Sequence, residues 1–143
     1  MATSGVFNGT ALLVKLDTSG GTPATVGHTT SCTISLSNDL PEATSKSSSG
    51  FQEVIAGVIS GEVSFDGLIM YDEAGTIKNA IDVADFLIAR TKLAISFGTA
   101  ETGDAVYSAS GFLSSVEMTG EMESPATYSG SITLTGSITK TTN

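Results

Sequence analysis

The sequence predicts a single, mainly β domain with one α-helix and one long polar loop. Three observations lead to this prediction. Several segments alternate apolar and polar residues with a period of two, and another segment has the apolar spacing of an amphipathic helix. The chain also contains 20 serines and 20 threonines, which suit strands with a polar face better than solvated helices. The 143 residues suffice for one hydrophobic core and no linker divides them, so we expect one domain over residues 1–143.

The clearest strand signals lie in residues 62–70 and 128–138. In the first segment Val63 and Phe65 share one face, while the polar residues between them occupy the other. The second segment alternates apolar residues or glycine with Ser and Thr over a longer distance. Both patterns are typical of half-buried antiparallel strands. Further strands are expected over residues 11–16, 23–26, 31–38, 93–97 and 105–118.

The last of these segments, residues 105–118, contains a glycine at which a long strand could bend. We expect the bend at Gly111. Beyond it, alternation places Phe112, Val116 and Met118 on one face of the strand.

One helix is expected over residues 73–90. Thr76 is the expected N-cap, because its side-chain oxygen could accept a hydrogen bond from a free backbone amide of the first turn. The apolar residues follow the i, i+3, i+4 spacing of an amphipathic helix: Ile77, Ala80, Ile81, Ala84, Leu87 and Ile88. A single helix of this kind packs one stripe against a sheet.

Residues 39–59 form a long loop in which a Ser/Thr/Lys run leads through Gly50 into an apolar segment. Loops of this length are uncommon without a function. An apolar segment at the end of a polar loop would expose a hydrophobic patch on a small monomer. We therefore predict that a neighbouring subunit covers its apolar residues: Phe51, Val54, Ile55, Val58 and Ile59. The alternative is that these residues pack inside their own subunit.

The net charge is −9, with 15 acidic residues against 6 basic ones. This balance disfavours nucleic-acid binding through phosphate contacts, which require clustered Lys and Arg. The excess of acidic residues is compatible with a surface along which a polyanion moves without binding, because like charges repel. Solubility is the plainer explanation of the same charge.

The chain lacks the residues that most enzyme and metal sites require. His28 is the only histidine and Cys32 the only cysteine, so a nucleophile–histidine site would depend on one of them. Structural zinc needs several such ligands, and no phosphate-binding glycine motif is present. We expect no catalytic, metal-binding or cofactor-binding residues and no enzymatic activity. We also expect no signal peptide and no membrane contact, because no basic and apolar leader or long apolar run is present.

Three features together resemble the major tail tube proteins of long-tailed phages. The first is the segment 39–57, with its Thr44-Ser45-Lys46 run and Gly50 followed by an aromatic residue. The second is the single helix between the central strands, and the third is the Ser/Thr-rich closing segment 128–138 with a late glycine. The resemblance covers most of the chain in order and spacing. One difference is Phe51, where relatives often carry tryptophan.

The resemblance implies a two-sheet β-sandwich or partial barrel with one flanking helix. It implies six subunits in a ring and rings stacked into a hollow tube around the exit path of the genome. It also implies that Thr44 and Lys46 join the apolar loop residues in the contacts between subunits. Together with the charge, it implies an acidic channel wall, for which the expected residues are Glu62, Asp66 and Glu117.

The implied partners are further copies of the chain, a tape-measure protein, and tail terminator or baseplate proteins. DNA would pass through the tube without specific binding. The protein would be made in the cytoplasm of a host bacterium and would be located in the virion tail. Two alternatives remain open: the tube of a contractile injection system, and an Ig-like adhesin or capsid decoration module. A carbohydrate-binding β-sandwich fits less well, since it would normally present aromatic platforms and this chain has no Trp and 3 Tyr.

Overall fold

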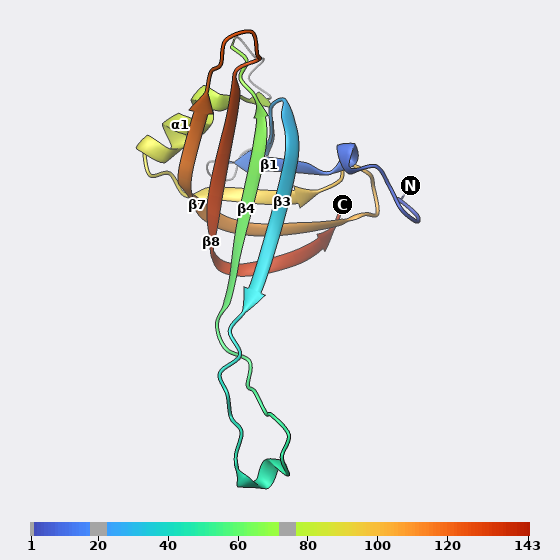
Figure 1. The fold of residues 1–143 in the computed structure, drawn as a ribbon. Coiled ribbons are helices and arrows are strands. Elements are labelled where there is room, and N and C mark those ends of the chain that lie inside the picture. The colour runs from blue at the N-terminus through green and yellow to red at the C-terminus, as the bar shows by residue number, and fades with distance from the viewer. Residues whose placement is uncertain (1, 18–22, 72–76) are drawn as a thin grey trace.

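The computed structural model describes residues 2–17, 23–71 and 77–143, which form one β-sheet and one α-helix (Figure 1). Every strand predicted from the sequence is present, with ends shifted by a few residues. The strands are β1 (Leu13–Asp17), β2 (Ala24–Val26), β3 (Thr29–Asn38), β4 (Ile59–Leu68), β5 (Ile77–Lys78), β6 (Leu93–Gly98), β7 (Ala105–Thr119) and β8 (Thr127–Thr142). The helix α1 is Ala80–Ile88, and two short 3-10 turns are η1 (Gly9–Ala11) and η2 (Lys46–Ser48).

The strands form a single eight-stranded sheet in the order β3-β4-β8-β7-β6-β1-β2-β5. Neighbouring strands are antiparallel except for β2 and β5, which are parallel. The long strands β7 and β8 connect two parts of this sheet. Residues 127–134 of β8 lie between β4 and residues 112–119 of β7. Together with β3, which pairs with β4, they form what we call the front half. The other portions of β7 and β8 run with β6, β1 and β2 in the rear half, and Figure 1 shows β1 crossing behind β3 and β4.

The expectation of two separate sheets is not confirmed, because all the strands belong to one hydrogen-bonded sheet. The reason is that β7 and β8 bend without losing their pairing. The register between them shifts between Ser108 and Ser110 and again between Leu113 and Ser115. Such bulges increase strand twist and allow a sheet to turn. Opposite the first shift, Gly136 adopts a φ of 77°, a left-handed conformation that glycine reaches without a steric penalty.

The hydrophobic core lies between the front and rear halves. Alternate residues of β4, such as Val63 and Phe65, face Leu16 of β1 and Leu93 of β6, and all of them are at most 1% exposed. The alternation predicted for residues 62–70 is thus correct. On β8, Gly130 lies beside Phe65, and a Cβ at that position would come within 2.7 Å of the ring. This glycine therefore makes room for the aromatic side chain in the core.

The helix is shorter than the predicted 73–90, since α1 begins at Ala80. Thr76, the expected N-cap, lies outside the described residues. Asn79 is the N-cap instead, because its side chain accepts bonds from Ile81 N at 3.0 Å and from Asp82 N at 3.1 Å. The Asp82 side chain in turn accepts a bond from Asn79 N at 3.3 Å, which completes a capping box. Residues 77 and 78, assigned to the helix from their spacing, pair with β2 as strand β5.

Candidate functional site

Residues 39–58 form an arm that projects from the end of the front half where β3 finishes and β4 begins (Figure 1). The two sides of the arm continue the pairing of these strands. Backbone hydrogen bonds join Asp39 N to Val58 O (2.9 Å), Gly57 N to Asp39 O (2.7 Å), Ile55 N to Pro41 O (3.0 Å) and Ala43 N to Glu53 O (2.8 Å). The segment predicted as a loop is therefore a two-sided arm that is hydrogen-bonded to itself.

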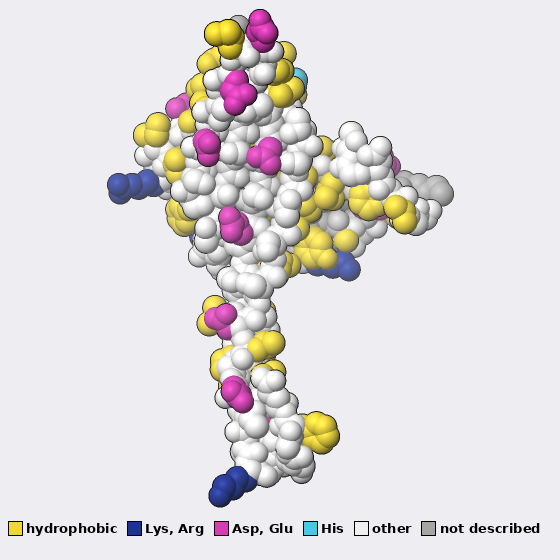
Figure 2. Space-filling model, in the orientation of Figure 1, with side chains coloured by type: hydrophobic (Ala, Val, Ile, Leu, Met, Phe, Trp, Pro, Cys, Tyr) yellow, Lys and Arg dark blue, Asp and Glu magenta, His cyan; other side chains and the backbone are white. Residues whose placement is uncertain are grey.

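The tip of the arm is the turn η2, which is held by serines. Ser45 N donates to Ser48 Oγ at 3.0 Å, and Ser48 N donates to Ser45 O at 3.0 Å. Gly50 follows with a φ of 83° and brings the chain back toward the body. Lys46 is the only Lys or Arg between positions 39 and 58, and Figure 2 shows a basic side chain at the tip. The arm thus presents one positive charge at its far end.

The apolar residues of the arm are exposed in the isolated chain. Phe51 is 77% exposed and Val58 71%, and Val54 and Ile55 are also exposed, as is Ile59 (66%) at the start of β4. They do not pack inside their own subunit, which was the alternative considered from the sequence. Leu40, which is 57% exposed on the same arm, was not among the residues predicted from the sequence. Its position directly before Pro41 within the polar run gave no periodic signal.

Thr44 lies on the arm, but its side chain bonds within the arm. Its hydroxyl accepts a hydrogen bond from Glu53 N at 3.0 Å and lies 3.3 Å from Glu53 O, to which it donates. Thr44 therefore holds the two sides of the arm together next to the isolated bridge between Glu42 and Val54. A contact of Thr44 with a neighbouring subunit stays a prediction.

The three acidic residues expected on a channel wall lie on the polar face of the front half. Asp66 of β4 and Glu117 of β7 are both opposite Ser129 of β8, and Glu62 lies opposite Thr133. All three carboxylates are exposed. Serines and threonines surround them, and Figure 2 shows this face with scattered Asp and Glu and without Lys or Arg over the strands. The face therefore has a negative potential and few apolar contacts to offer.

The front half has an unpaired edge on each side. β3 pairs only with β4, so its other edge carries free backbone groups among the residues that the structure describes. On the opposite side, β6 pairs with β7 only up to Gly111, so residues 112–119 have no described partner strand beyond β8. Unpaired edges of this length are templates for pairing with another chain.

Both termini are fixed near the β6–β7 turn by Asp104. Its carboxylate accepts bonds from Thr3 Oγ1 at 2.5 Å, Thr99 Oγ1 at 2.5 Å and Thr3 N at 2.6 Å. These bonds, chiefly those from the Thr3 and Thr99 hydroxyls, lower the pKa of Asp104. The backbone oxygen of Asp104 also accepts a bond from Asn143 N at 2.8 Å. Asp104 therefore joins the two ends of the chain to the rear half.

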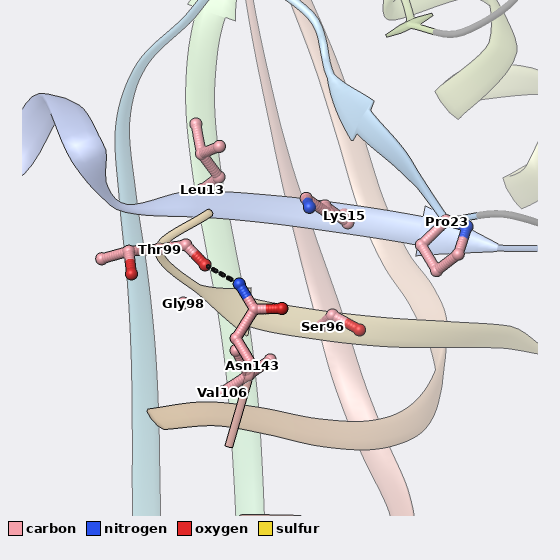
Figure 3. Close-up of a pocket in the computed structure, with 8 residues that line it drawn as sticks. All are labelled: Leu13, Lys15, Pro23, Ser96, Gly98, Thr99, Val106 and Asn143. Atoms are coloured by element: carbon pink, nitrogen blue, oxygen red, sulfur yellow. Dashed lines mark hydrogen bonds between the residues drawn. The ribbon is translucent and has the colours of Figure 1, made fainter. Parts of the chain in front are cut away.

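A shallow pocket on the rear half has no arrangement for catalysis. Figure 3 shows its eight lining residues, of which Lys15 is the only one with an ionisable side chain. Asn143 closes one side, where its Nδ2 donates to Thr99 O at 3.2 Å. The lining side chains therefore include no acid–base pair.

The two residues on which a nucleophilic site would depend lie apart from this pocket. His28, with a φ of 52°, occupies the turn between β2 and β3. Cys32 is half-buried on β3, where its Sγ lies 3.5 Å from Leu12 O, and burial raises the pKa of its thiol. A raised pKa makes a thiol less nucleophilic at neutral pH. Among the described residues, no group of three metal-ligating side chains and no helix able to cross a membrane is found.

Comparisons with solved structures show the same fold in assembled tails and tubes. A chain from the tail of a gene transfer agent particle, determined with C6 symmetry, is 23% identical over 95% of this chain and 99% of that one, with a TM-score of 0.80. The SPP1 tail tube protein is 10% identical over 96% of this chain and 80% of that one, with a TM-score of 0.75. A chain from the sheath–tube complex of the extracellular contractile injection system PVC is 11% identical over 92% and 88%, with a TM-score of 0.61.

No curated protein sequence matches this chain significantly. The likeness to the solved structures, at these identities, establishes the fold. A family model for phage tail tube proteins, however, matches residues 6–140, which is nearly the whole chain. The chain therefore belongs to the phage tail tube protein family and is a structural subunit of a tail tube.

Proposed function

We propose that six copies of this chain form a ring by pairing the free edges of their front halves, and that the rings stack into a hollow tube. The observation that carries this proposal is the pair of unpaired edges, β3 on one side and residues 112–119 of β7 on the other. The ring size follows the resemblance noted above and the C6 symmetry of the gene transfer agent tail.

The directions of the strands favour this closure. β3, β4, β8 and β7 alternate in direction, so the two edges of the front half run antiparallel to each other. Rotating one copy onto the next about a tube axis parallel to the strands leaves the strand directions unchanged. The β7 edge of one copy would then meet the β3 edge of the next in antiparallel orientation, and the sheet would continue around the ring without an exposed edge.

The polar face of the front half would line the channel. Glu62, Asp66 and Glu117 of each copy would make the wall negative, so that DNA passes through it without lasting phosphate contacts. The opposite face is unsuitable for this role because it carries the core.

The arm would make contacts beyond its own ring. It extends from the front half along the direction of β3 and β4, which would be the direction of the tube axis (Figure 1). Its exposed apolar residues, including Phe51 and Val58, and its terminal Lys46 would then contact copies in the adjacent ring. Many modest contacts repeated around and along the tube would add up to a stable polymer.

The assembled protein would be located in the virion tail after synthesis in the cytoplasm of a host bacterium. A tape-measure protein would occupy the channel before DNA does, and terminator or baseplate proteins would cover the open ends of the tube. The tube of a contractile injection system is a second candidate, which the likeness to the PVC sheath–tube complex supports. The family match favours either tube over an adhesin or a capsid decoration module.

The first test is negative-stain electron microscopy of the purified full chain at high concentration, with light scattering to follow assembly. We expect six-fold rings or hollow tubes. Hydrogen exchange would then locate the ring contact, since edge amides of β3 and of residues 112–119 should become protected on assembly. A compact monomer at every concentration, or unchanged exchange at both edges in tubes, would contradict the proposal.

A second experiment tests the arm. Replacing residues 39–58 with Asn-Gly would join β3 to β4 by a two-residue hairpin turn. The shortened chain should fold, because the arm contributes no residue to the hydrophobic core, but should not form tubes. Tubes from a variant with no arm would show that the arm is dispensable for assembly.

A further inference from the structure

We propose that helix α1 of one copy docks its exposed apolar stripe into the groove between β3 and η1 of the next copy in the ring. This inference rests on the proposed edge pairing and adds a second, side-chain contact to it. The groove is the receptor and a second copy of the chain is the occupant.

The groove is the open side of the hydrophobic core. It lies where the N-terminal segment passes the start of β3, has a volume of about 580 Å³, and is lined by Thr10, Leu12, Leu13, Thr29 and Cys32 among others. Leu12 and Cys32 are only partly buried although both pack against the core. Figure 2 shows hydrophobic side chains in the hollow between the body and the N-terminal segment. The groove is therefore apolar at its base and open to solvent.

The occupant has a matching apolar surface. One side of α1 faces its own core through Ala80 and Val83, which are buried. Ile81 and Ile88 lie seven residues apart and so share another face of the helix. Ile88 is 79% exposed and Ile81 37%, so among the described residues this stripe is only partly covered within its own copy. An apolar stripe on a surface helix indicates packing against another element.

The fold places the stripe and the groove where edge pairing would bring them together. Figure 1 shows α1 beyond the β7 side of the front half and the N-terminal segment beyond the β3 side, and both lie toward the end where β3 begins. Both also lie on the core side of the front half, since α1 packs against β7 and Cys32 packs against the core. When the β7 edge of one copy pairs with the β3 edge of the next, α1 is carried to the mouth of that groove.

Cys32, the only cysteine, is a built-in probe of this contact. In wild-type tubes, its rate of modification by a small maleimide should fall at least about tenfold relative to the dilute monomer, because the neighbouring helix covers the groove. A second readout uses Ile88→Cys. Treating its tubes with a short bismaleimide should join Cys32 of one copy to position 88 of the next, giving a ladder of covalent oligomers on a denaturing gel.

Two matched variants control the cross-linking experiment. Thr133→Cys places an exposed thiol on the polar face of the front half, away from the groove, and should give no ladder. Ile88→Cys combined with Cys32→Ser should also give none. Wild-type tubes whose Cys32 reacts as fast as in the monomer, or Ile88→Cys tubes without a ladder, overturn the docking while leaving the tube intact. Wild-type protein that forms neither rings nor tubes refutes the proposed assembly and this inference with it.

Discussion

Phe51 gives the sharpest test of the arm as an assembly element. The side chain is 77% exposed in the isolated chain, so any role in folding is small. Complete burial of a phenylalanine contributes about 1.5–3 kcal/mol. Covering the exposed part in a neighbouring subunit would therefore contribute roughly 1–2 kcal/mol per copy to assembly.

The perturbation is Phe51→Ser, measured through the critical concentration of assembly. Because about 1.4 kcal/mol corresponds to a tenfold change in an equilibrium constant, the critical concentration should rise roughly 5- to 30-fold. The assay is ultracentrifugation of tubes at several total concentrations, followed by measurement of the protein left in the supernatant. The midpoint of urea unfolding of the monomer should change little, as expected for an exposed position.

Phe51→Leu is the matched control, because it retains most of the apolar area and should assemble almost as well as the wild type. If Phe51→Ser assembles at the wild-type critical concentration while its monomer stays folded, then no neighbour covers this side chain. The assignment of the arm's apolar residues to the interface would then have to be abandoned for Phe51.

Three further predictions concern stability and the channel. Tyr128→Phe removes a buried hydroxyl that donates to Gly27 O at 2.5 Å and should lower the unfolding free energy by about 1–2 kcal/mol in urea titrations. Burial raises the pKa of Tyr128 to about 12. The difference in unfolding free energy between the wild type and Tyr128→Phe should therefore be present below pH 10 and lost as pH rises toward 12. The pKa of Asp104 is lowered, so the wild type should be more stable than Asp104→Asn at pH 7, and thermal melts should show the gap closing as pH falls below about 4 through that pKa. Replacing Glu62, Asp66 and Glu117, which we propose line the channel, with lysine should make tubes retain DNA at low salt in filter-binding assays and release it as salt rises. Equal retention by wild-type tubes would argue against a repelling wall.

The strand pattern was predictable from the sequence because the side-chain alternation of a strand is local. In residues 62–70 the apolar residues predicted to face inward, Val63 and Phe65, are the ones that are buried. The arm was also evident, since no local pattern explains an apolar segment after a polar run. Phe51, predicted from the sequence to be covered by a neighbouring subunit, is exposed in the isolated chain, and its contact with a neighbour stays a prediction.

Predictions failed where a non-local contact or an irregular backbone decides the conformation. The bulge after Leu113 shifts the register of β7, so Leu113 is buried while Phe112, expected on the same face as Val116, is 43% exposed on the other side. The helix begins later than its spacing indicated because Ile77 pairs with β2, far away in sequence, and Asn79 supplies the cap.

The sequence by itself determined the class of the fold, the polar and acidic character of one strand face, and the presence of an arm. These follow from composition and from the alternation of apolar and polar residues, which are properties of short segments. Only the tertiary structure decided that all the strands belong to one bent sheet and that its front half ends in two unpaired edges. It also decided that a helix stripe and an open groove lie on opposite sides of that half. These features depend on which strands pair and where they stop pairing, and such pairings between distant segments leave no periodic mark in either segment alone.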